Sequence, residues 1–233
     1  ITSICTISGR ATTSFHGWIN VLSKNPRMTD ISYKQELLRK TVHLSSLWIP
    51  ALILFAPRAV CVGLFAFLLS GNIVVEYGYY KRLPFFVNTY GRLFSKMLRD
   101  KETKGGFRFS GSPYVLGAAL AVSALFPTVC AACAMTVMLI SDTVAALIGR
   151  PFGKHKINQG KKSVEGALAF FAAGALVVFG TTVCFQTDGA FLARGLSGVF
   201  AAMFAEVYEN RLKIDDNLSI PLIVGAFLSL PLS

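Results

Sequence analysis

Long apolar stretches separated by short polar segments dominate the pattern of this 233-residue chain. A helix needs about 20 apolar residues to cross the hydrocarbon core of a bilayer, and several stretches reach or approach that length. The pattern therefore predicts an all-α polytopic integral membrane protein with about seven transmembrane helices. The first, third and last stretches are short, so each must include flanking residues in order to span. The seven stretches are 44–56, 59–77, 114–126, 128–148, 164–185, 191–207 and 218–232.

Composition agrees with this pattern, and the distribution of charge adds an orientation. Charged residues make up only 15% of the chain and the mean hydropathy is +0.55, whereas soluble domains carry about 25% charged residues. The net charge of +11 does not indicate a nucleic-acid partner, because 21 of the 23 Lys and Arg residues lie before the first stretch or in alternate connections. The other connections hold only Arg58 and Arg194. The positive-inside rule then places the N-terminus and the basic connections in the cytoplasm.

The chain divides into an N-terminal segment and one membrane-embedded domain. Residues 1–29 hold many Ser and Thr and no acid, and they lack the continuous apolar core of a secretory signal. We expect this segment to be disordered, a targeting segment or extraneous, and residues 30–233 to form the domain. A helix is expected from residue 30, where Glu36 and Lys40 are four residues apart, as are Arg39 and His43. Residues 90–98 are either a surface amphipathic helix or a solvated loop.

Ionisable side chains within or beside the predicted spans gather toward the cytoplasmic side. Such groups are costly in a membrane and by default indicate function. Among the acids of the domain, Asp188 is predicted to face the other compartment. A one-sided polar cluster suits an enzyme that joins a cytosolic reagent to a membrane-dissolved one, whereas a transporter more often places polar groups near the midplane. The clustered residues are Arg39, Lys40, His43, Glu76, Asp142, Glu165, Glu206, Glu209, Asp215 and Asp216.

The stretch around Asp142 combines a small-residue helix face with a basic loop that contains glycine. Asp142, Ala145, Ala146 and Gly149 share one helical face. A carboxylate for a divalent cation, next to cations for phosphates, is what nucleotide phosphoryl chemistry requires. A structural alternative is that Asp142 is a buried acid paired with Arg39 or a lysine. The candidates for nucleotide binding are Gly149, Arg150, Gly153, Lys154, Lys161, Lys162, Ser163 and Glu165.

Three separated motifs resemble those of the CTP-dependent lipid-alcohol kinases, which include dolichol and polyprenol kinase, phytol kinase and CTP-dependent diacylglycerol kinase. The first is Arg39-Lys40-x-x-His43. The second runs from Asp142 through Gly149-Arg150 to the Gly-Lys-Lys-Ser-x-Glu-Gly run at 160–166, and the third is Asp-Asp-Asn-Leu-Ser-Ile-Pro at 215–221. The resemblance implies transfer of the γ-phosphate of CTP to a membrane lipid alcohol at the cytoplasmic face, with Asp142 as the essential acid and Arg39 and Lys40 as required basic residues.

The expected mechanism uses Mg²⁺ on the CTP phosphates, held by Asp142 with Asp215 or Asp216. Lys161, Lys162 and Arg150 neutralise the transferring group, while Arg39 and Lys40 close the site. A general base is left open among Glu76, Glu206 and His43, and the sequence leaves the oligomeric state open.

Two other functions compete with this interpretation. The central motif is also similar to part of CDP-diacylglycerol synthase, a CTP:phosphatidate cytidylyltransferase. The chain lacks that enzyme's C-terminal Pro-Gly-His-Gly-Gly and Asp-Arg-x-Asp runs, which favours the kinase. A small-anion transporter would explain spans and basic loops, but not acids confined to one face.

Overall fold

The computed structural model describes residues 33–91, 107, 109–158, 162–212 and 214–231. These residues belong to one compact unit, Ser32–Ser233. The expected N-terminal segment 1–29 and residues 92–98 of the expected surface segment lie outside the described residues.

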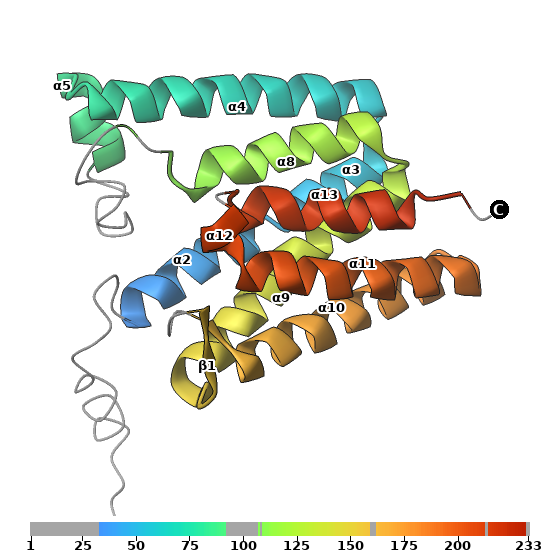
Figure 1. The fold of residues 1–233 in the computed structure, drawn as a ribbon. Coiled ribbons are helices and arrows are strands. Elements are labelled where there is room, and N and C mark those ends of the chain that lie inside the picture. The colour runs from blue at the N-terminus through green and yellow to red at the C-terminus, as the bar shows by residue number, and fades with distance from the viewer. Residues whose placement is uncertain (1–32, 92–106, 108, 159–161, 213, 232–233) are drawn as a thin grey trace, which may run out of the picture. The chain divides into compact units, whose positions relative to one another are not determined.

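The described part of the chain is almost entirely helical (Figure 1), which confirms the all-α class. Its one sheet is a two-residue antiparallel hairpin of β1 (Lys156–Ile157) and β2 (Lys162–Ser163). The helices in chain order are α2 (Tyr33–Ser45), α3 (Trp48–Phe55), α4 (Arg58–Tyr80), α5 (Pro84–Phe86), the π-helical turn η1 (Val87–Gly91), α8 (Gly111–Leu125), α9 (Thr128–Phe152), α10 (Val164–Cys184), α11 (Gly189–Val207), α12 (Glu209–Leu212) and α13 (Asp216–Leu228).

Four of the described helices, α4, α9, α10 and α11, are long and apolar enough to cross a membrane. Each coincides with a predicted span. The other three predicted spans correspond to α3, α8 and α13, which have 8, 15 and 13 residues. At 1.5 Å per residue these helices are about 12–23 Å long, which is less than a hydrocarbon core of about 30 Å. The membrane-protein class therefore holds, while seven spans and a cytoplasmic N-terminus stay predictions.

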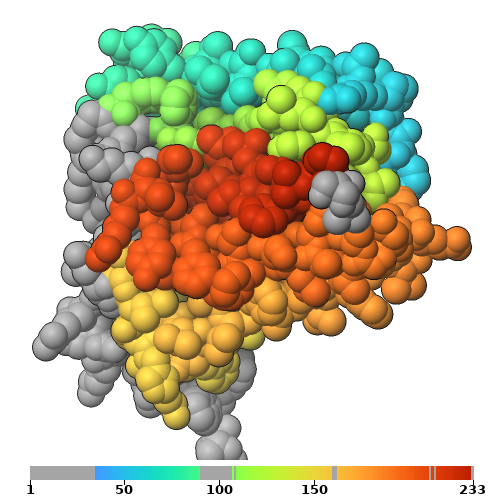
Figure 2. Space-filling model, turned by 45° about the vertical axis from the view of Figure 1, so that its right-hand side comes forward, coloured from blue at the N-terminus to red at the C-terminus, as the bar shows by residue number. Residues whose placement is uncertain are grey.

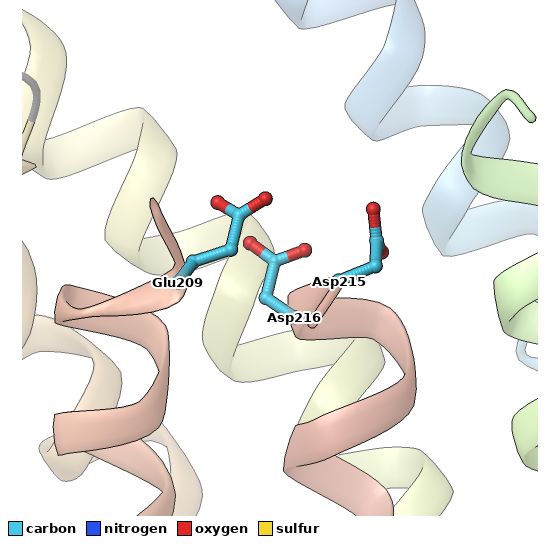
Figure 3. A group of neighbouring side chains, drawn as sticks. All are labelled: Glu209, Asp215 and Asp216. Atoms are coloured by element: carbon cyan, nitrogen blue, oxygen red, sulfur yellow. The ribbon is translucent and has the colours of Figure 1, made fainter. Parts of the chain in front are cut away.

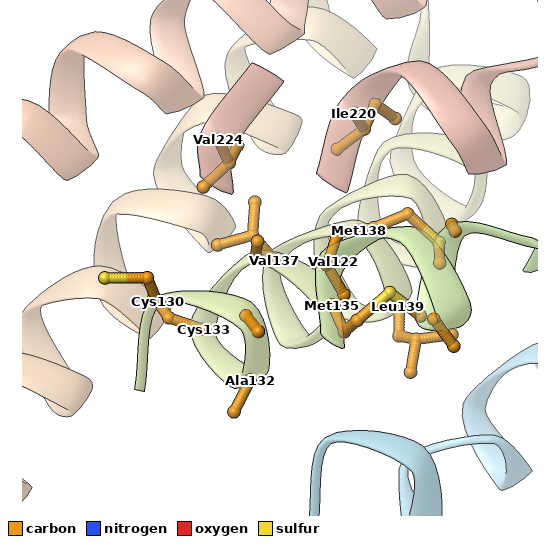
Figure 4. Close-up of a cluster of buried hydrophobic side chains, with 14 of the residues drawn as sticks. Val122, Cys130, Ala132, Cys133, Met135, Val137, Met138, Leu139, Ile220 and Val224 are labelled. Atoms are coloured by element: carbon orange, nitrogen blue, oxygen red, sulfur yellow. The ribbon is translucent and has the colours of Figure 1, made fainter. Parts of the chain in front are cut away.

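Helix α9 occupies the centre of the bundle. It packs against α2, α3, α8, α10 and α13. In its most apolar window 67% of residues are buried, compared with 17% for α4. Its buried side chains are small or flexible, including Ala132, Cys133, Met135 and Met138 (Figure 4), so neighbouring helices approach closely. Asp142 is thus carried by the most enclosed of the four long helices.

Helix α13 is the second central element. It packs against α8, α9 and α11, and in Figure 2 it lies in red between α8 and the orange α11. Gly198 and Gly225 allow this packing, because a methyl group at Gly198 would lie 2.9 Å from Cβ of Phe227 and one at Gly225 would lie 2.4 Å from the Phe126 ring. This packing places α13, whose first turn is acidic, against α9, the helix that carries Asp142.

The two cations outside the predicted cytoplasmic connections have structural partners. Arg58 donates from Nε to the carbonyl of Ser123 at 2.8 Å and from its guanidinium to Ala124, at the last turn of α8. Arg194 donates from its guanidinium to the carbonyl of Leu230, just after α13. Cations near helix C-termini satisfy free carbonyls and oppose the helix dipole. Both arginines therefore stabilise helix ends.

Candidate functional site

Asp142 lies buried on α9, about 15 Å along the helix before its end at Phe152. Lys40 on α2 donates a hydrogen bond from Nζ to Oδ2 of Asp142. Nε2 of His43, one turn further along α2, lies 3.5 Å from the same oxygen. The structure thus contains the lysine partner that the sequence left as an alternative, and it joins two of the predicted motifs.

A second ion-pair group fastens α2 to the end of α9. Oε2 of the buried Glu36 accepts from Arg39 at 3.2 Å and from Arg150 at 3.0 Å. The spacing in the sequence predicts that Glu36 lies beside Lys40 on one helix face, and Glu36 is not among the predicted site residues. Its partner Arg150 lies 114 residues away in the sequence, so local residue spacing could not predict this ion pair. Glu36 therefore holds two of the predicted site cations, Arg39 and Arg150, in place.

Lys162 joins the basic loop to the C-terminal acids. Its Nζ donates to Oε1 of the buried Glu206 and lies 3.7 Å from Oδ2 of Asp216. Burial by itself would lower the pKa of Lys162, but Glu206, Asp216 and Asp142 raise it above its usual value. Lys162 is therefore a firmly charged cation among three carboxylates. Lys161, its predicted partner in phosphate binding, lies outside the described residues.

Three carboxylates meet where α12 gives way to α13. One oxygen each from Glu209, Asp215 and Asp216 lies within 4.8 Å of the others (Figure 3). Oδ1 of Asp215 caps α13 by accepting from the backbone N–H of Asn217 at 3.1 Å and from its Nδ2 at 2.6 Å. Burial, together with the charge of Asp216, raises the pKa of Asp215 to about 7. Mutual repulsion of this kind is relieved by a divalent cation.

This carboxylate group does not include Asp142. The sequence predicts Asp142 with Asp215 or Asp216 as metal ligands, and Glu209 only as an acid at the end of the sixth span. In the described structure the C-terminal acids gather with Glu209, while Oδ2 of Asp142 is occupied by Lys40. Oxygen donors of this type suit Mg²⁺.

The small residues of the central motif bring α9 and α10 into close contact. A methyl group at Gly149 would lie 3.1 Å from Cα of Gly166, and one at Gly153 would lie 2.4 Å from Oγ of Ser163. Oγ of Ser163 accepts from the N–H of Gly166 at 3.2 Å, which caps α10, and donates to the carbonyl of Gly149 at 3.3 Å. These residues thus have a packing role, and their part in nucleotide binding stays a prediction.

This packing role leads to a stability prediction. Replacing Gly149 by Ala is expected to destabilise the folded protein by about 1–3 kcal/mol, because the added methyl meets backbone that cannot move freely. The measurement is thermal unfolding of the purified protein in detergent. Gly63→Ala is the matched control, since a methyl at Gly63 on α4 meets nothing within 4 Å. Equal melting temperatures for the two variants would contradict the packing role.

The remaining predicted residues lie around the same end of the bundle. Glu165 accepts from the backbone N–H of His155 at 3.1 Å and contacts its Nδ1 at 2.8 Å, which fastens the exposed hairpin region that carries Lys154. Glu76, at the end of α4, accepts from the backbone N–H of Ser110 at 2.9 Å and from its hydroxyl. Ser110 caps α8, so Glu76 holds the start of that helix in place.

Together, the fold and the site define an all-helical membrane protein that collects ion-paired side chains from both halves of the sequence at one end of its helices. The chain belongs to the same family as the uncharacterized protein RP860 of Rickettsia prowazekii, with which it is 31% identical over 191 residues, 80% of this chain and 90% of that protein.

Two further relatives extend this comparison. CTP-dependent diacylglycerol kinase 1 of Schizosaccharomyces pombe is 27% identical over 228 residues, 85% of this chain and 94% of that protein. The uncharacterized protein MJ1137 of Methanocaldococcus jannaschii is 34% identical over 93 residues, 40% of this chain and 44% of that protein. No family model and no solved structure matches the chain. The distant similarity to the yeast kinase supports kinship with CTP-dependent lipid kinases.

Proposed function

We propose that this protein transfers the γ-phosphate of CTP to the hydroxyl of a membrane lipid alcohol, at the cytoplasmic face of the membrane. The acceptor belongs to the class of polyprenols and dolichols, phytol-like alcohols or diacylglycerol. The observation that carries the proposal is the convergence of the three motifs on one charged cluster. Lys40 contacts Asp142, and Lys162 contacts Asp216, although each pair is separated by many residues in the chain. The similarity to a CTP-dependent diacylglycerol kinase supports CTP as the phosphoryl donor.

Mg²⁺ fits the three carboxylates of Glu209, Asp215 and Asp216. Their oxygens are close enough to one another to share an ion, and the pKa of Asp215 is raised first by burial and then by the neighbouring charge of Asp216. When bound there, Mg²⁺ would help to neutralise the charge of the CTP phosphates. We assign the metal to this group and give Asp142 a separate role as the partner of Lys40 and His43.

The cations surround the place where phosphates would lie. Lys162 contacts Asp216, one of the three carboxylates proposed to hold the metal. Arg150 is held at the same end of the bundle by its ion pair with Glu36. Both would neutralise the transferring phosphoryl group, with Lys161 and Lys154 as further candidates on the same segment. Arg39 and Lys40 on α2, which contact Glu36 and Asp142, would close the site.

The competing function is cytidylyl transfer to phosphatidate, and one experiment separates the two. Purified protein in lipid nanodiscs is given CTP labelled at either the γ- or the α-phosphate, with dioleoylglycerol, a polyprenol, phytol or phosphatidate. We expect the γ-label to enter an alcohol and the α-label to leave as CDP. If the α-label enters lipid when phosphatidate is the acceptor, the kinase function is refuted and the synthase is favoured. Absence of turnover with every lipid would favour the transporter.

A further inference from the structure

His43 has a buried ring nitrogen, Nε2, that makes no hydrogen bond to the described residues. The His43 side chain is 10% exposed, and within the described part of the chain its Nε2 has no hydrogen-bond partner. The backbone of Met138 hydrogen-bonds the imidazole, which leaves Nε2 as the free ring position. A buried polar nitrogen without a partner is unfavourable. Such an atom in a native site indicates a place for a ligand group.

The surroundings of Nε2 specify what kind of group fits. Oδ2 of Asp142 lies 3.5 Å from Nε2, which is too far for a good hydrogen bond. That oxygen already accepts a hydrogen bond from Nζ of Lys40. In a neutral imidazole bonded at its other nitrogen, Nε2 is an acceptor. An acceptor nitrogen beside an acceptor oxygen calls for a hydrogen-bond donor, and an alcohol O–H is a donor of the right size.

The position also suits a substrate that arrives from the bilayer. On the same helix as His43, Leu38 and Val42 lie four residues apart and are exposed by 45% and 42%. On a helix they form one apolar strip next to the site residues. Hydrocarbon chains can lie against this strip while the polar end of the lipid turns inward. The other two candidate bases are engaged: Glu76 by Ser110 and Glu206 by Lys162.

Building on the kinase function proposed above, we propose that Nε2 of His43, beside Oδ2 of Asp142, binds the hydroxyl of the acceptor lipid alcohol and serves as its general base. As the alcohol oxygen bonds to the γ-phosphorus of CTP, its O–H bond breaks and the proton passes to Nε2. The bond from the γ-phosphorus to the bridging oxygen breaks at the same time, and its electron pair leaves with CDP. The imidazolium is stabilised by the carboxylate of Asp142 and later releases its proton to water.

The test compares His43→Gln and His43→Ala with the wild-type protein in nanodiscs, using γ-labelled CTP and whichever alcohol of the panel above supports turnover. We expect both variants to lose about 100-fold or more in kcat. The Gln amide oxygen still accepts a hydrogen bond but takes up no proton at neutral pH. The KM for the alcohol should therefore stay within about threefold of wild type in His43→Gln and rise in His43→Ala.

Two further readouts distinguish a base from a structural histidine. Wild-type kcat should fall at acid pH as His43 becomes protonated, under the influence of Asp142, Asp216 and Lys40, the charged groups that act on it. This acid limb should disappear in His43→Ala, and added imidazole should restore part of its activity. Stabilisation against heat by CTP with Mg²⁺ should persist in both variants. His16→Gln, in the N-terminal segment, is the matched control and should behave as wild type.

Each result decides between the alternatives. A kcat within about threefold of wild type in His43→Ala, or a reduced kcat with an unchanged acid limb and no rescue by imidazole, overturns the role of His43 while the kinase function stands. Loss of heat stabilisation by CTP in both variants, with no rescue, also overturns it, because His43 would then support the fold. A wild-type protein that transfers only the α-label refutes the kinase function itself.

Discussion

Asp142→Asn is expected to insert into the membrane and fold, yet to lose about 100-fold or more in kcat. The carboxylate balances the charge of Lys40 and lies 3.5 Å from Nε2 of His43. An amide carries no negative charge. The hydroxyl subsite therefore loses its negative partner, and the buried Lys40 loses its counter-ion. Removing one member of a buried ion pair typically destabilises a protein by about 3–5 kcal/mol. Turnover and thermal stability therefore need to be measured on the same preparation.

A double variant separates function from stability at this position. Asp142→Asn combined with Lys40→Met removes the unpaired charge and should recover most of the lost stability without recovering turnover. Recovery of turnover in the double variant would mean that the pair serves stability alone. Asp188→Asn is the matched control, because Asp188 lies outside the three motifs and caps α11 by accepting from the N–H of Phe191 at 2.8 Å. Because Asn caps a helix about as well as Asp, Asp188→Asn should change stability little and leave turnover unchanged.

Asp216→Asn is expected to raise the Mg²⁺ concentration needed for half-maximal activity by about tenfold or more. This residue belongs to the carboxylate group with Glu209 and Asp215 and also contacts Lys162 at 3.7 Å. The measurement is kinase activity as a function of free Mg²⁺. Lys162→Met provides the comparison, since it should raise the KM for CTP more than the Mg²⁺ requirement. Identical Mg²⁺ curves for Asp216→Asn and the wild type would exclude this group as the metal site.

The same site should respond to pH with a defined sign. Because burial and Asp216 raise the pKa of Asp215 to about 7, Asp215 keeps its proton at pH values below that point when no metal is present. Mg²⁺ must displace this proton, so the Mg²⁺ requirement should increase as the pH falls below about 7. Asp215→Asn should flatten that dependence while weakening Mg²⁺ binding at high pH. A pH-independent Mg²⁺ requirement in the wild type would contradict the link between Asp215 and the metal.

Local patterns in the sequence were sufficient for the helices and for the most conspicuous site residues. Each predicted span overlaps an observed helix, because an apolar run long enough for a helix is visible without knowledge of its neighbours. Asp142 stood out for the same reason, as a carboxylate within an apolar run. The helix lengths were less predictable. Proline residues at 57 and 127, at the N-caps of α4 and α9, help to set where helices begin, and α3, α8 and α13 came out shorter than a full span.

What the sequence by itself determined is the all-α membrane class and the residue types of the site, since hydropathy and charge are properties of single residues and short windows. The tertiary structure alone decided the partners. It paired Lys40 with Asp142, Arg150 with Glu36 and Lys162 with Glu206. It also grouped Glu209 with Asp215 and Asp216. An ion pair depends on the distance between two atoms, and for residues far apart in the chain that distance is set by how α2, α9 and α13 pack together.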